Sequence, residues 1–118
     1  MKRHRLVTFA ALAFVACTGI KARQDVLLPA IQAAWPAVRA EAVLGDPKVE
    51  PVAVQADAAM QAGDKAAIGV VPWPLIQTAA GAGVAAKLAA GTGSVGVADS
   101  LRERDRQFFG GIQVYLQR

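Results

Sequence analysis

Apolar residues repeat every three or four positions between residues 25 and 44, which is the spacing of one face of an α-helix. The stripe consists of Leu27, Ile31, Ala34, Val38 and Ala42. Asp25, Gln32 and Arg39 mark a polar face. We predict a helix over 25–44, ended by Gly45, that is kinked or broken near Pro36, because a proline inside a helix removes a backbone hydrogen bond.

A second, shorter helical stretch is predicted at 51–62, ended by Gly63 and Asp64. Its few large apolar residues include Val52 and Val54, which would also fit a short strand. The sequence leaves both alternatives open.

Residues 66–86 carry no charge, and the segment is long enough to span a membrane. Pro72, Pro74, Gln77 and three glycines disfavour insertion. We therefore prefer a buried core segment, read as a strand at 67–71 followed by a helix that starts at Pro74. Insertion of 66–86 into a membrane is the alternative.

The C-terminal part combines a glycine-rich linker at 91–98 with a capping-box pattern, Ser100 to Glu103, which predicts a helix over 101–109. Gly110 and Gly111 should end this helix, and the alternating residues 112–117 then favour a strand. If the helix instead continues through the glycines, four large residues share one face. These are Leu101, Phe108, Ile112 and Tyr115.

Together these elements predict a single small domain over 25–118 that is mainly α-helical, with proline-started helices and a minor β element at 67–71 and 112–117. Its apolar content is rich in alanine, which favours helix but buries little surface. The core must therefore rely on few large residues. Trp35 and Trp73, each beside a proline, are either core anchors, which is the more usual role, or an exposed partner or membrane interface.

The N-terminal residues have the pattern of a secretory signal peptide. Residues 1–5 are basic, and residues 6–16 are uncharged and short. An apolar helix of that length covers roughly 16 Å, whereas the hydrocarbon layer is ~30 Å thick. We predict that residues 1–16 are a cleaved signal peptide. The alternative is the first helix of a cytoplasmic domain.

The only cysteine, Cys17, lies where this segment ends. Phe14-Val15-Ala16-Cys17 resembles the lipobox of small bacterial lipoproteins, some of which are encoded by bacteriophages. It departs from the family at Phe14, where an aliphatic residue is usual. The resemblance implies that the Cys17 thiol receives a diacylglyceryl group, that 17–24 form the attachment point and a short tether, and, because Thr18 is not Asp, that the outer membrane is favoured. Ordinary cleavage near Thr18 would instead release a secreted protein.

The formal net charge of +4 comes mostly from this leader, since the chain from Cys17 onward has 10 basic and 9 acidic residues. Nucleic-acid binding needs a dense basic face. The only basic cluster, residues 102–106, alternates with acids, and Arg102 can pair with Asp105 and Glu103 with Arg106 on a helix. We predict a solvated helix face there and no nucleic-acid partner.

Catalytic groups are scarce. The sole histidine, His4, lies in the leader, so the remaining chain offers no imidazole for nucleophilic catalysis or metal binding. The acids follow no calcium-loop spacing, and the glycines follow no phosphate-loop spacing. We predict a non-enzymatic cell-envelope lipoprotein without cofactor or metal, anchored by acyl chains in membrane lipid and acting on an envelope protein. The alternative is an integral or membrane-perturbing protein that uses 66–86.

Overall fold

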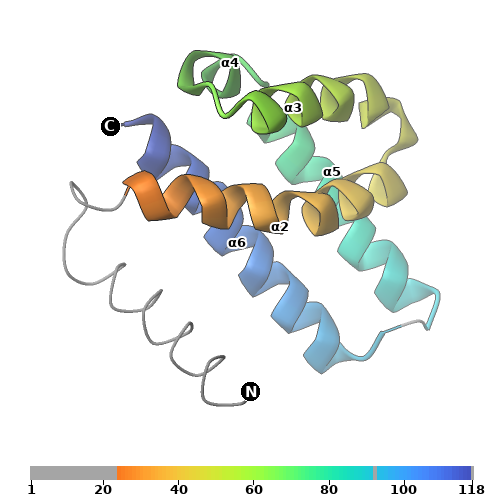
Figure 1. Cartoon of the computed structure of the whole chain (residues 1–118). Coiled ribbons are helices and arrows are strands. Elements are labelled where there is room, and N and C mark those ends of the chain that lie inside the picture. Colours follow the sequence, from red (N-terminus) through yellow and green to blue (C-terminus); the bar gives the residue numbers. More distant parts are fainter. Residues whose placement is uncertain (1–23, 92, 118) are drawn as a thin grey trace.

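The computed structural model describes residues 24–91 and 93–117. The predicted signal peptide and Cys17 lie outside these residues. The elements are the α-helices α2 (Gln24–Gly45), α3 (Glu50–Ala62), α4 (Lys65–Gly69), α5 (Trp73–Ala89) and α6 (Val95–Leu116), and the 3₁₀ turn η2 (Pro47–Val49). Figure 1 shows α2 lying across α5 and α6, with α3 and α4 along one side. The prediction of a mainly α-helical small domain is confirmed.

The helix predicted at 25–44 is confirmed as α2, which continues through both Pro29 and Pro36. A break at Pro36 is wrong. Pro36 itself is exposed, while the neighbouring Trp35 and Val38 are buried. Packing of this apolar stripe on both sides of the proline outweighs the lost backbone hydrogen bond.

The helix predicted at 51–62 and its end at Gly63 are also confirmed. Gly63 adopts a left-handed conformation with φ 64°, and its N–H donates to Ala59 O at 3.0 Å. Asp64 then caps α4 by accepting from the N–H of Ala66 at 3.1 Å. The strand expected at 67–71 is therefore wrong, because this cap starts the short helix α4, which ends at Gly69.

The helix α6 begins earlier and ends later than predicted. Ser94 Oγ accepts from the N–H of Val97 at 3.2 Å and is the actual N-cap, whereas Ser100 donates to Gly96 O inside the helix. The helix continues through Gly110 and Gly111 to Leu116, so the strand at 112–117 is wrong and the alternative helix is confirmed. Gly111 faces α2, where an added Cβ would lie 3.3 Å from Ile31 Cγ2.

An aromatic cluster joins the three long helices at the centre of the core. The ring centroids of Trp35 on α2 and Trp73 on α5 are 5.7 Å apart, and Phe108 on α6 lies 6.0 Å and 5.9 Å from them. Aromatic pairs at these separations contribute about 0.5–1.5 kcal/mol beyond area burial. The few large residues of this alanine-rich chain therefore gather where three helices meet.

Small residues bring α2 and α5 together along the rest of their contact. A Cβ added at Gly83 would lie 2.0 Å from Glu41 O, and one added at Gly45 would lie 2.0 Å from Ala79 O. Real Cβ atoms do not approach that closely, so these two positions need glycine. The close approach of the two helices places Glu41 against α5, within reach of a charged side chain of that helix.

Candidate functional site

The two tryptophans named as a candidate interface are core residues. Trp35 is 4% exposed and Trp73 is 7% exposed. Each indole N–H has a partner: Trp35 donates to Asp57 Oδ1 at 2.7 Å, and Trp73 donates to Ile68 O at 2.8 Å. The structure thus places both in the core role and not on a surface that a partner could reach. Cys17, the predicted lipid-attachment residue, lies outside the described residues.

Arg39 joins α2 to α3 through two carboxylates. Its Nε lies 2.9 Å from both oxygens of Asp57, and its Nη2 lies 2.9 Å from Glu50 Oε2. The hydrogen bond to Glu50 is the largest cause of a raised pKa for Arg39, with burial acting against it. Arg39 and Gln32 were identified in the sequence as a polar face. In the structure that face turns towards α3, where Gln32 donates to Met60 O at 2.7 Å.

Glu41 forms a second network with the opposite arrangement of charges. Its side chain is fully buried, and each carboxylate oxygen accepts from a different helix: Oε2 from Lys87 of α5 at 3.0 Å, and Oε1 from Arg104 of α6. Sequence reasoning missed this cluster, because the three residues lie far apart in the chain. One feature of the sequence pointed to burial of Glu41: it lies directly beside Ala42 of the apolar stripe.

Asp105 extends this cluster on α6. Arg104 donates to Asp105 Oδ1 through Nη2 at 2.8 Å and through Nε at 3.2 Å. Burial raises the pKa of Asp105, and the nearby Glu41 raises it further, while Arg104 acts in the opposite direction. The prediction of a solvated face is therefore wrong for Arg104 and Asp105. It holds for the Glu103–Arg106 pair, and Arg102 lies near Asp99, with its Nη1 3.6 Å from Oδ1.

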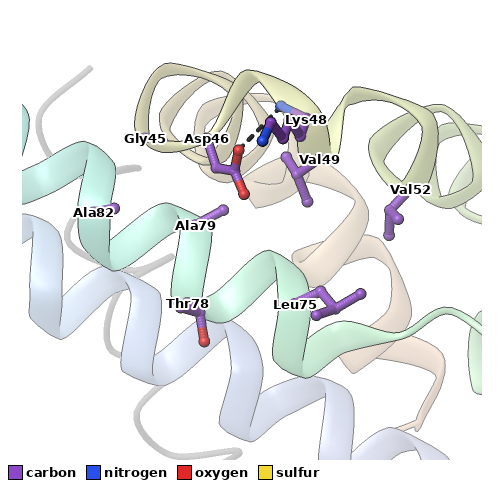
Figure 2. A pocket seen from close by; sticks show the side chains of 9 residues that line it. All are labelled: Gly45, Asp46, Lys48, Val49, Val52, Leu75, Thr78, Ala79 and Ala82. Atoms are coloured by element: carbon purple, nitrogen blue, oxygen red, sulfur yellow. Dashed lines mark hydrogen bonds between the residues drawn. The ribbon is translucent and has the colours of Figure 1, made fainter.

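An open groove of about 390 Å³ lies between the C-terminal end of α2, η2 and α5. Its lining is mostly apolar and includes Gly45, Asp46, Lys48, Val49, Val52, Leu75, Thr78, Ala79 and Ala82. Figure 2 shows Val49 and Ala79 pointing into the space between η2 and α5. Leu75 is 57% exposed, and the Asp46 carboxylate already accepts from the N–H of Lys48 at 3.1 Å. The groove offers an apolar contact surface with few polar groups.

The uncharged segment 66–86 does not form one helix, since α4 ends at Gly69 and α5 begins at Trp73. Among the described helices, none is long and apolar enough to cross a membrane. Within residues 24–91 and 93–117, three or more histidine, cysteine or acidic side chains are nowhere grouped so that they could hold a metal ion.

Comparisons with known proteins place this chain in no family. No protein-family model matches it. No curated protein and no solved structure matches it either.

Proposed function

We propose that this protein is a small, non-enzymatic lipoprotein of the cell envelope, anchored through acyl chains on Cys17 and acting by binding an envelope protein. One observation carries the proposal: a basic start and a short apolar segment lead directly to the only cysteine, and the first helix of the body follows at Gln24. This order is typical of a signal peptide, a lipid-attachment residue and a short tether.

The tether keeps the body near the membrane. Residues 18–23 separate Cys17 from α2, and six extended residues span at most about 20 Å. One acyl chain alone binds a membrane only marginally, so the two chains of a diacylglyceryl group are what make the anchor stable. A Cβ added at Gly63 would lie 3.6 Å from Leu28, and one added at Gly111 would lie 3.7 Å from Leu27, so these parts of the bundle lie beside the start of α2. Because the tether joins α2 there, this end of the bundle would be the one nearest the lipid.

The groove is well placed for a partner in this arrangement. It is lined by Gly45 at the C-terminal end of α2, whereas the tether joins the N-terminal end. A helix of 22 residues is about 33 Å long. The end of the groove at Gly45 would therefore lie well away from the point of attachment. We expect the envelope partner to bind in this groove, where Leu75 offers an exposed apolar side chain.

The anchor is tested by the intact mass of the protein from the membrane fraction of the cells that make it. We expect a chain that begins at Cys17 and carries the added mass of acyl groups. Cys17→Ser should release the protein from membranes on carbonate extraction. A Cys17→Ser protein that resists extraction would favour the membrane-inserted alternative for 66–86, and a cytosolic chain that retains Met1 would refute export.

The groove is tested with a photo-crosslinking residue at Thr78. We expect a discrete adduct with an envelope protein in intact cells, and its loss on Leu75→Asp. Gln77→Asp is the matched control, because Gln77 is exposed on α5 but does not line the groove. If both acidic substitutions leave the adduct unchanged, the partner does not bind here.

A further inference from the structure

Arg104 is shared between carboxylates of two different helices. Its Nη2 donates to Asp105 Oδ1 on α6 at 2.8 Å and to Glu41 Oε1 on α2. Its Nε also donates to Asp105, at 3.2 Å. The two bonds to Asp105 stay within α6, whereas the bond to Glu41 links Arg104 to α2. The guanidinium is therefore divided between a local partner and a bridge between helices.

The surroundings of Asp105 make its negative charge unfavourable. Its side chain is 12% exposed, so an ionised carboxylate loses most of its hydration. The charged groups that face it are Arg104 on its own helix and Glu41 on α2, and Glu41 is in turn bound by Lys87 of α5. Burial and the second carboxylate outweigh the attraction of Arg104, and the pKa of Asp105 is raised as a result.

We propose that Asp105 and Glu41 compete for Arg104, so that acidification, which neutralises Asp105, strengthens the bridge between α6 and α2. Neutral Asp105 is a weaker acceptor for a cation than its carboxylate, because charge-assisted hydrogen bonds are the stronger ones. Arg104 is then free to direct its donors to Glu41. The ion cluster of Glu41, Lys87 and Arg104 therefore holds α6 to α2 more strongly at lower pH, independently of any lipid anchor.

The sign of the effect follows from proton linkage. When the pKa of an acid is higher in the folded than in the unfolded chain, the folded state binds more protons between the two values. Stability from this group is fully present below the unfolded-state value and is lost as the pH rises through the folded-state value. Acidification from neutral pH therefore stabilises the fold through Asp105.

Urea unfolding of the full-length chain from pH 7 to about pH 4 tests this competition for Arg104, with the fluorescence of buried Trp35 and Trp73 as the signal. Asp105→Asn keeps the shape of a neutral Asp105. We expect the wild-type unfolding equilibrium constant to fall on acidification relative to that of Asp105→Asn. The drop should grow as the pH falls, towards a limit of about tenfold for each unit by which the folded-state pKa exceeds the unfolded-state value.

Asp99→Asn is the matched control, because Asp99 lies on the same helix with a side chain that is 71% exposed. Its pH profile should run parallel to that of the wild type. If the wild-type and Asp105→Asn profiles have the same slope, the proposal is wrong.

A titration of the unaltered protein by NMR gives an independent test that does not depend on the folding of a variant. The Asp105 carboxyl carbon should titrate above the ordinary aspartate value, and the Arg104 Nε resonance should shift with the same midpoint. An ordinary midpoint for Asp105, or an Arg104 resonance that does not follow it, would overturn the competition.

Discussion

Two ion networks are centred on Arg39 and Glu41 of α2, and they differ in the sign of the central charge and in their exposure to solvent. Arg39 is a cation between two acids of α3, and the side chains of Arg39, Glu50 and Asp57 are 26%, 47% and 40% exposed. Glu41 is an acid between two cations of other helices, and its own side chain is fully buried. Position relative to solvent, more than the number of ion pairs, decides what each network contributes.

Water and salt weaken the Arg39 network. Exposed pairs contribute about 0.2–1 kcal/mol each, since the Coulomb attraction is weak at high dielectric. The Glu41 carboxylate is shielded from water, and its loss removes the acceptor that Lys87 and Arg104 share. Removing one member of a buried pair costs about 3–5 kcal/mol. Ion pairs therefore contribute little to stability on the side of α2 that faces α3, and much more on the side that faces α5 and α6.

The largest effect is expected for Glu41→Gln. This substitution keeps the shape of the side chain but removes the charge between Lys87 and Arg104. We expect a loss of about 3 kcal/mol in the free energy of unfolding, at the low end of the range for broken buried pairs because Lys87 and Arg104 remain 39% and 30% exposed. Urea unfolding measures it.

Glu50→Gln is the matched control, because it makes the same substitution in the exposed network. Its cost should stay below about 1 kcal/mol. Equal costs for the two variants would contradict the contrast between the networks.

A smaller loss of stability is expected for Gly83→Ala, which disrupts the close approach of α2 and α5 at Glu41. The new Cβ would lie 2.0 Å from Glu41 O, so α2 and α5 must separate. Overpacking of this kind costs about 1–3 kcal/mol. Gly81→Ala, where a Cβ meets nothing within 4 Å, should instead stabilise the helix by about 0.5–1 kcal/mol. Thermal unfolding of the two variants should shift in opposite directions.

The smallest effect is expected for Asp57→Asn in the exposed network. The amide oxygen still accepts from the Trp35 indole, so only the charge opposite Arg39 is lost. We expect a cost of about 0.2–1 kcal/mol at low salt. At 1 M salt the screening length falls to about 3 Å, and this cost should disappear.

The cost of Glu41→Gln should survive the same increase in salt, because buried pairs are screened much less. Urea unfolding of both variants at low and high salt makes the comparison. A salt-sensitive Glu41 variant beside a salt-insensitive Asp57 variant would reverse our assignment of the two networks.

Local patterns in the sequence identified α2 and α3 well, because each depends on residues within a few turns of itself. The spacing of Leu27, Ile31 and Val38 indicates one apolar helix face. Gly63 indicates a helix end, and in the structure it has the left-handed conformation. The same kind of local reasoning failed at Gly110 and Gly111. These residues lower helix propensity, yet the helix passes through them because Phe108, Ile112 and Tyr115 are buried on both sides.

The sequence by itself determined the helical character of the body, the apolar face of α2 and the pattern from which a lipid anchor is proposed. Only the tertiary structure decided that Glu41 is buried and that Trp35 and Trp73 pack together. Lys87 and Arg104 lie 46 and 63 positions from Glu41 in the chain. Their meeting depends on the angle and closeness with which three helices cross, which Gly83 and the aromatic cluster set, and no local pattern records that geometry.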